Sequence, residues 1–116
     1  MASSLRQKRV SDRIRAELSD LLRREMADPR LKLVTVTDVS IDRELEYANV
    51  WVCRPDGDPA EKDVLAALEG AKGFLRRELA ARVQLRHAPQ FVFHWDRAPD
   101  HAAKIEQVLD ELKLKT

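Results

Sequence analysis

Apolar residues recur every three or four positions near the start of the chain, which is the spacing of an amphipathic helix. This pattern predicts a helix over residues 4–27, with Ser4 as its N-cap. Pro29 disfavours helical geometry at the residue before it, so the helix should end ahead of this proline. The buried stripe of the helix would consist of Val10, Ile14, Leu18, Leu21, Leu22 and Met26.

Two segments rich in β-branched residues follow, and together they predict an antiparallel hairpin. The first, LVTVTDVSI at 33–41, alternates in polarity, but its apolar positions change parity between Val36 and Val39. A β-bulge near Thr37–Asp38 would bring both halves of the strand onto one face. After a short turn, EYANVWVCR at 46–54 predicts the second strand.

The rest of the chain predicts helices on either side of a third strand. The expected elements are a loop at 55–59, helices at 60–70 and 73–86, a strand at 90–95 and a helix at 100–114. In the strand, Phe91, Phe93 and Trp95 alternate as a core-facing row would. The order α-β-β-α-α-β-α therefore predicts an α+β fold, with a three-stranded sheet and helices packed on one face.

Two of the chain's three glycines, Gly70 and Gly73, interrupt what otherwise reads as one long amphipathic helix. Glycine inside a helix costs about 1 kcal/mol relative to alanine. Two such costs within four residues indicate that the backbone bends there, or that another molecule approaches it closely.

Length and charge narrow the class of protein. The 116 residues suffice for one domain, which we expect to span residues 1–116.

The net charge is only +1, but the charges are unevenly distributed along the chain. Residues 70–87 hold five Lys/Arg against one Glu, and residues 38–69 hold three Lys/Arg against nine Asp/Glu. Residues 1–30 are basic as well, with eight Lys/Arg against five Asp/Glu. A surface polarised in this way attracts a polyanion to one side. Solvated helix faces, or ion pairs with the acidic segment, are the alternative interpretation.

Several other classes find no support in the sequence. No apolar run reaches the roughly 18 residues of a membrane span, and the N-terminal MASSLRQKRV does not resemble a signal peptide. We therefore expect a cytoplasmic protein. Cys53 has no histidine near it in sequence and is expected to be a buried thiol, and no glycine-rich nucleotide loop is present. We predict no enzyme activity, no cofactor and no small-molecule substrate.

Two further groups of residues are candidates for a metal site and for base stacking. His94, Asp96, Asp100 and His101 cluster in sequence but lack a recognised metal-ligand spacing, and Asp100 is better explained as the N-cap of the last helix. We expect no metal site. Tyr47, Trp51 and Trp95 could stack unpaired bases on an open sheet face, although strand aromatics usually serve packing.

The stretch Gly70-Ala71-Lys72-Gly73 matches the Gly-x-x-Gly loop of the KH domain, an RNA-binding fold. Over nearly its whole length, however, the chain resembles the bacterial ribosome-binding factor A family, which is KH-like of type II. That family has an Ala-x-Gly kink in place of Gly-x-x-Gly, and Ala71 and Gly73 occupy those positions, followed by FLRREL. Further family-like stretches are RVSDRIRAELSDLLRREMADPRL at 9–31, VTVTDVSIDRELEYANVWV at 34–52 and LRHAPQFVFHWD at 85–96.

The resemblance implies a single KH-like domain of order α-β-β-α-kink-α-β-α, with Ala71 and Gly73 forming the kink. It also implies a non-catalytic assembly factor that binds the small (30S) ribosomal subunit and assists late maturation and processing of 16S rRNA, notably in the cold. We expect the free protein to be a monomer. The alternatives are a generic KH-like module for single-stranded RNA, which would use Gly70–Gly73 as a phosphate grip, and a protein-interaction domain.

The basic residues of two helices are the candidate RNA contacts. Lys72/Arg76 and Arg82/Arg86 are spaced as i,i+4 pairs that share one side of a helix. The predicted RNA-binding set is Lys72, Gly73, Arg76, Arg77, Arg82 and Arg86, extended from the first helix by Arg6, Lys8, Arg9 and Arg13.

The chain departs from the family pattern near its end. Where the family has Ser, then Gly and Arg, this sequence has Ala98, Ala102 and Lys104. Lysine keeps the charge of arginine but loses its bidentate fork. No role is therefore assigned to residues 96–104.

Overall fold

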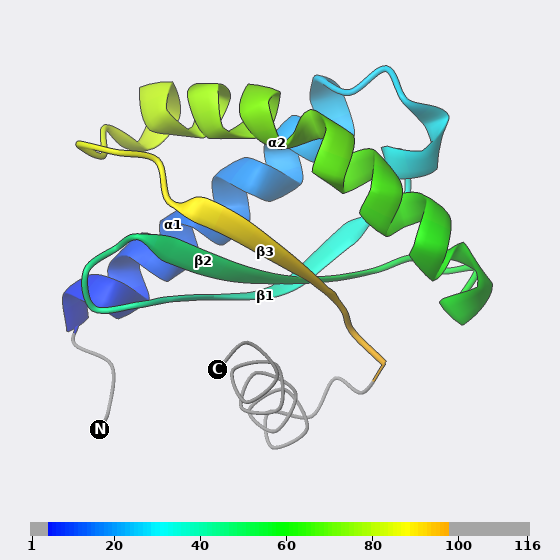
Figure 1. The fold of residues 1–116 in the computed structure, drawn as a ribbon, viewed down its shortest axis with the longest axis horizontal. Coiled ribbons are helices and arrows are strands. Elements are labelled where there is room, and N and C mark those ends of the chain that lie inside the picture. The colour runs from blue at the N-terminus through cyan, green and yellow to red at the C-terminus, as the bar shows by residue number, and fades with distance from the viewer. Residues whose placement is uncertain (1–4, 98–116) are drawn as a thin grey trace.

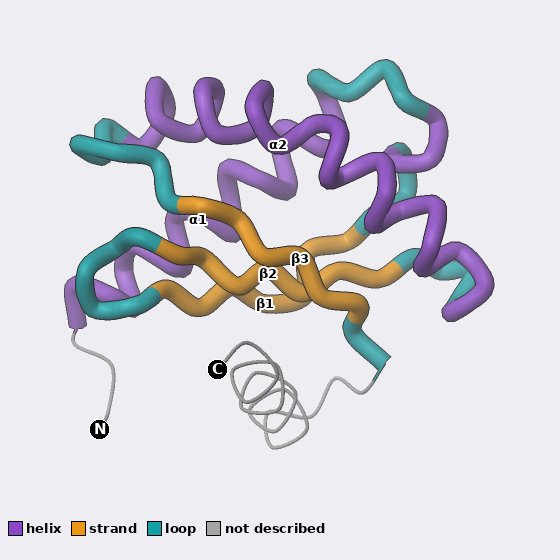
Figure 2. Tube along the Cα trace, in the orientation of Figure 1, coloured by secondary structure: helices purple, strands orange, loops and turns teal. Residues whose placement is uncertain are grey.

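Three strands form a mixed sheet in the computed structural model, which describes residues 5–97. Strand β1 (Thr35–Ile41) pairs antiparallel with β2 (Tyr47–Cys53), and β2 pairs in parallel with β3 (Gln90–Trp95). Helices α1 (Leu5–Arg24) and α2 (Glu61–Val83) both cover the same face of the sheet (Figures 1 and 2). The predicted α+β architecture is confirmed.

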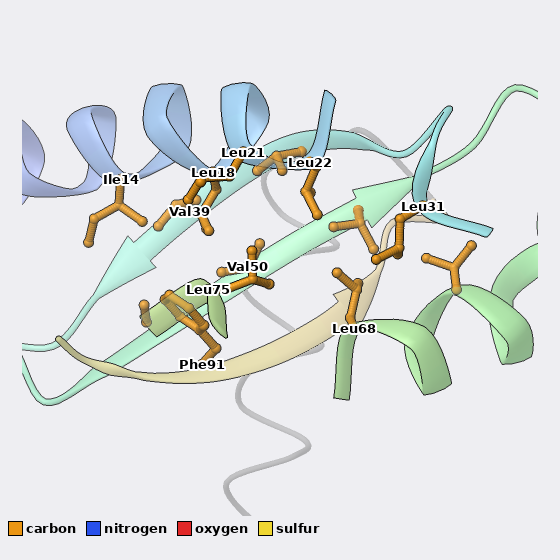
Figure 3. Close-up of a cluster of buried hydrophobic side chains, with 14 of the residues drawn as sticks. Ile14, Leu18, Leu21, Leu22, Leu31, Val39, Val50, Leu68, Leu75 and Phe91 are labelled. Carbon is orange, nitrogen blue, oxygen red and sulfur yellow. The ribbon is translucent and has the colours of Figure 1, made fainter. Parts of the chain in front are cut away.

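Helix α1 buries Ile14, Leu18, Leu21 and Leu22 of the predicted stripe against the sheet (Figure 3). Val10 is only half-buried, and Met26, also half-buried, lies beyond the end of the helix. It ends at Arg24 rather than at residue 27. The chain must be extended before Pro29, and Asp28 adopts that conformation, with φ −69° and ψ 118°. Asp28 then caps a short 3-10 helix, accepting a hydrogen bond from the Arg30 amide at 2.9 Å.

The β-bulge predicted in β1 is confirmed. The register with β2 shifts between Val36 and Asp38, and as a result Val36 and Val39 are both buried. Thr37, the residue at the bulge, donates its hydroxyl to Asp96 Oδ2 at 2.6 Å. The bulge thus joins β1 to the residue that follows β3.

The core lies between the sheet and the two helices (Figure 3). Ala48, Val50 and Val52 of β2 pair with Phe91, Phe93 and Trp95 of β3, so these residues share the helix-facing side. Phe91 and Trp95 are buried and Phe93 is half-buried, which confirms the predicted core row. On the opposite face, Trp51 stacks on His94 with ring centroids 4.9 Å apart.

Residues 61–83 form one continuous helix, α2, where the sequence predicted two helices separated by a glycine break. Neither Gly70 nor Gly73 has a positive φ, so helical geometry continues through both. The helix bends about midway (Figure 1), in the part that carries the glycines. Leu68 before the bend and Leu75 after it are both fully buried, so packing against the twisted sheet holds both halves.

The end of α2 also differs from the prediction. Gln84 adopts a left-handed conformation (φ 57°, ψ 38°), which ends the helix at Val83 rather than at residue 86. Arg86 therefore lies in the connection to β3, and the predicted helical pair of Arg82 with Arg86 is wrong. The predicted helix at 100–114 and its cap Asp100 lie outside the described residues.

Candidate nucleic-acid interface

Four segments meet at one end of the molecule: the start of α1, the β1–β2 turn, the end of α2 and the α2–β3 connection (Figure 1). Several hydrogen bonds join them. Gln7 Nε2 donates to Ile41 O at 3.1 Å, the Gln90 amide donates to Glu46 O at 2.7 Å, and Arg13 Nη2 donates to Arg82 O at 3.0 Å. The segments are therefore held in a fixed arrangement.

Five exposed arginines lie on these segments, and none has a hydrogen-bond or ion-pair partner among residues 5–97. Arg6 and Arg9 precede Arg13 at helical spacings of seven and four residues, so they extend the side of α1 that reaches α2. Unpaired guanidinium groups are suited to bind phosphate because no existing ion pair has to be broken first. We call this set the basic end: Arg6, Arg9, Arg43, Arg77 and Arg86.

Arg82 is placed differently from the other predicted RNA contacts, because α1 supplies it with two carboxylates. Its Nη1 lies 2.8 Å from Asp20 Oδ2 and 3.2 Å from Glu17 Oε1. The hydrogen bond to Asp20 raises the pKa of Arg82, and the same bond lowers the pKa of Asp20 below its usual value. Arg82 thus links the end of α2 to the middle of α1.

Arg76 is half-buried and holds the α2–β3 connection. Its Nε donates to Pro89 O at 3.2 Å and its Nη2 donates to Ala88 O at 3.1 Å. Nη1 is used by neither bond, so part of the guanidinium can still donate to a ligand.

The remaining predicted cations have partners of their own. Lys72 pairs with Glu69 at 2.9 Å and lies 5.9 Å from the centre of the Phe93 ring. Lys8 lies 3.9 Å from Asp12, and Arg13 lies 3.1 Å from Glu17. Such exposed pairs are worth little, about 0–1 kcal/mol. These pairs can therefore be exchanged for phosphate.

The two glycines of α2 present open backbone. A Cβ atom built at Gly70 or Gly73 would meet no atom within 4 Å, so no neighbouring group among the described residues requires glycine there. Ala71, the other predicted kink residue, is half-buried and packs against the core. Of the two possibilities raised by the sequence, a bend is present, and the space beside it is free for an approaching ligand.

The three aromatic residues considered for base stacking differ in their exposure to solvent. Trp51 is only 3% exposed and Trp95 only 2%, and the Trp95 indole donates to Asp58 Oδ1 at 2.8 Å. Tyr47 is 52% exposed, so it alone of the three offers a ring to a base.

Three other residues that were considered from the sequence, His94, Asp96 and Cys53, lie within the described part of the chain. His94 is buried against Asn49, with Nε2 at 2.8 Å from Oδ1, and Asp96 Oδ2 accepts a hydrogen bond from Thr37. Among residues 5–97 no three metal-ligating side chains gather, and His101 lies outside that range. Cys53 is half-buried rather than fully buried. None of the helices in the described part of the chain combines the length and the apolar character needed to cross a membrane.

Arg43 was missed by the sequence prediction. It lies in the acidic segment 38–69, where local charge favours the opposite assignment. The hairpin carries it to the same end as the start of α1 (Figure 1). The only available signal was the predicted turn itself, which places residues 42–45 at a tip of the sheet.

The sequence was compared with known proteins. A sequence model of the family "Ribosome-binding factor A" matches residues 6–109. Ribosome-binding factor A of Brevibacillus brevis is 45% identical over 104 residues, which cover 90% of this chain and 86% of the relative. The Clostridium perfringens protein of the same name is 38% identical over 115 residues, which cover 97% of this chain and 99% of the relative.

Solved structures agree with the sequence comparison. The crystal structure of ribosome-binding factor A from Thermus thermophilus superposes with a TM-score of 0.70 at 28% identity, covering 79% of this chain and 98% of that one. A homology model of the Thermus thermophilus protein, fitted into a cryo-electron-microscopy map of its complex with the 30S subunit, gives a TM-score of 0.58 at 32% identity. It covers 75% of this chain and 97% of that one.

Proposed function

This chain belongs to the ribosome-binding factor A family, and from that membership we propose that it is an assembly factor that binds the small (30S) ribosomal subunit. The observation that carries the proposal is the similarity to a relative that has been placed in a 30S complex. The whole chain, residues 1–116, acts as a single non-catalytic domain, works in the cytoplasm and is a monomer when free. On the subunit it contacts 16S rRNA and assists late maturation of that RNA.

The basic end supplies the phosphate contacts. Its five arginines are exposed and have no partner within the described part of the chain. Arginine contacts to phosphate position a protein on RNA without reading sequence. Lys72 and the open backbone at Gly73 add contacts along α2, while Lys8 and Arg13 add them along α1. Arg76 and Arg82 act from within, because they hold the segments that present the other cations.

The first test is co-sedimentation of the purified protein with isolated small subunits across a salt series. The double variant Arg77→Glu/Arg86→Glu reverses two exposed cations that have no hydrogen bond or ion pair within residues 5–97, so folding should be kept. We expect this variant to lose most of its subunit binding at moderate salt, because each lost phosphate contact weakens binding and lowers its salt dependence.

The matched control is Lys32→Glu/Lys62→Glu. These lysines are also exposed and lack ion pairs among the described residues, and they give the same change in charge away from the basic end. We expect the control to bind nearly as the unmodified protein does. Equal weakening by both double variants would mean that only net charge matters, and would contradict the assigned surface.

One observation favours a second candidate function, a generic module for single-stranded RNA. Gly70 and Gly73 are exposed and have open space beside them, as a Gly-x-x-Gly phosphate grip requires. Such a module would bind a short unstructured RNA as tightly as it binds the subunit. Binding to subunits together with weak binding to the oligonucleotide would favour the assembly factor.

A further inference from the structure

A shallow groove lies beside the basic end, between the β1–β2 turn and the α2–β3 connection. Its volume is about 420 Å³, enough for one nucleobase but not for a helix. The side chains that line it come from three elements and two loops: Glu44, Glu46, Tyr47, Arg76, His87 and Gln90. None of the phosphate contacts proposed above requires this groove.

Tyr47 gives the groove an exposed aromatic wall. It is the first residue of β2, it pairs with Gln90 of β3, and its amide donates to Asp42 Oδ1 at 2.9 Å. The backbone that carries the ring is therefore fixed. Exposed rings held in this way are platforms on which unpaired bases stack.

Arg76 gives the groove a fixed donor. Two backbone carbonyls, of Ala88 and Pro89, hold its Nη2 and Nε, which leaves Nη1 for a ligand. On the other side, the turn is held by the Leu45 amide, which donates to Asp42 O at 3.1 Å, with Leu45 in the left-handed region at φ 58°. Both walls exist before any ligand arrives.

The charges of the groove select among possible ligands. Glu44 and Glu46 line it beside Arg76, so a phosphate would meet two carboxylates. An uncharged base avoids that repulsion. Guanine also offers two parallel N–H donors, which suit a carboxylate, and O6 and N7 acceptors, which suit a guanidinium. Adenine, cytosine and uracil lack this combination.

We propose that this groove binds one unpaired guanine of RNA, with the base stacked on Tyr47. The O6 and N7 acceptors face Arg76, and the N1 and N2 donors face the carboxylates of the turn. The inference rests on the proposed function, because it places the ligand in the RNA that the basic end binds. It adds a contact that distinguishes one base from another to a surface whose other proposed contacts are to phosphate.

The deciding experiment uses the full chain and no ribosome. Isotope-labelled protein is titrated with the RNA pentamers UUGUU and UUAUU while the backbone amide signals are followed by NMR. We expect UUGUU to shift the signals of residues 44–47, 87, 88 and 90, and UUAUU to shift them much less. Equal shifts with both pentamers, or shifts confined to other regions, would overturn the proposal.

Substitutions at Tyr47 complete the test. Tyr47→Ala should weaken UUGUU binding by roughly 5- to 100-fold, the range expected for loss of one stacked base. Tyr47→Phe keeps the ring and should bind nearly as well as the unmodified chain. Because the side chain is half exposed, neither change should unfold the protein, and unshifted signals from β2 and β3 would verify this. Equal binding by the Ala and Phe variants would overturn the proposal.

Co-sedimentation separates this inference from the function on which it rests. We expect Tyr47→Ala to weaken subunit binding relative to Tyr47→Phe. If the two variants bound subunits equally while Arg77→Glu/Arg86→Glu had lost binding, the guanine site would be wrong and the assembly function would stand. If the unmodified protein failed to bind subunits, the proposed assembly function would be wrong. The pentamer titration would still show whether the groove binds guanine.

Discussion

At the scale of single residues, the end of α2 depends on the backbone conformation of Gln84. Gln84 ends the helix in the left-handed region, where a side chain with a Cβ is disfavoured and glycine is not. Gln84→Gly should therefore raise the free energy of unfolding by about 0.5–1 kcal/mol. Urea denaturation measures this change. Gln84→Ala, which keeps the Cβ, is the control, and an equal gain from both substitutions would contradict the explanation.

Gly70 and Gly73 have ordinary helical φ values and open space around them. Alanine at either position should raise the free energy of unfolding by about 1 kcal/mol, because nothing opposes the better helix former. Binding should separate the two positions. If RNA approaches the backbone at Gly73, Gly73→Ala will weaken subunit binding and Gly70→Ala will leave it unchanged. Equal binding by both variants would show that RNA does not approach the backbone at Gly73.

The sequence could not settle the role of these glycines. Residue propensity predicts a helix break at Gly70 and Gly73, yet the helix continues, because Leu68 and Leu75 on either side are buried in the same core. Tertiary packing overrides a local cost of this size. The β-bulge at Thr37 was predictable for the opposite reason, since a change of apolar parity within a strand has few other solutions.

At the scale of elements, Arg82 ties α2 to α1 through Asp20 and Glu17, at 2.8 and 3.2 Å. The side chain is 26% exposed and the pair is partly screened by solvent, so Arg82→Gln should cost little stability. Its effect on subunit binding should be smaller than that of Arg77→Gln, which removes a cation with no partner among residues 5–97. Co-sedimentation at one salt concentration compares the two. A larger loss of subunit binding with Arg82→Gln than with Arg77→Gln would indicate that Arg82 contacts RNA directly.

The same link predicts a dependence of stability on acid. The hydrogen bond from Arg82 lowers the pKa of Asp20 in the folded protein below its usual value of about 3.9. The stabilisation is therefore complete above pH 4 and is lost as the pH falls through the folded-state pKa. Asp20→Asn should make the urea midpoint less sensitive to pH between about 4 and 2. The control is Glu25→Gln, which removes a carboxylate that has no ion pair with any other described residue. An unchanged pH profile for Asp20→Asn would contradict the assignment.

At the scale of the whole molecule, the fold redistributes charge in a way that the linear sequence conceals. Arg82 and Arg86 are close in the sequence, but Arg82 pairs with α1 whereas Arg86 is exposed in the α2–β3 connection. Arg43 sits among acidic neighbours in the sequence and yet joins the basic end, because the hairpin turn lies beside the start of α1 (Figure 1). Helices and strands were therefore predictable from spacing, whereas the membership of the site depended on which ends the topology brings together.

Arg43 gives the sharpest test of that arrangement. If it contacts phosphate, Arg43→Gln should lower the slope of log affinity against log salt by about 0.7–0.9, as Arg86→Gln should. Lys62→Gln removes a cation from the same acidic segment of the sequence, but Lys62 lies in the first turn of α2, away from the basic end, and its slope should not change. Subunit binding measured across a salt series gives all three slopes. An unchanged slope for Arg43→Gln would remove the hairpin turn from the interface and confine the phosphate contacts to the two helices and the α2–β3 connection.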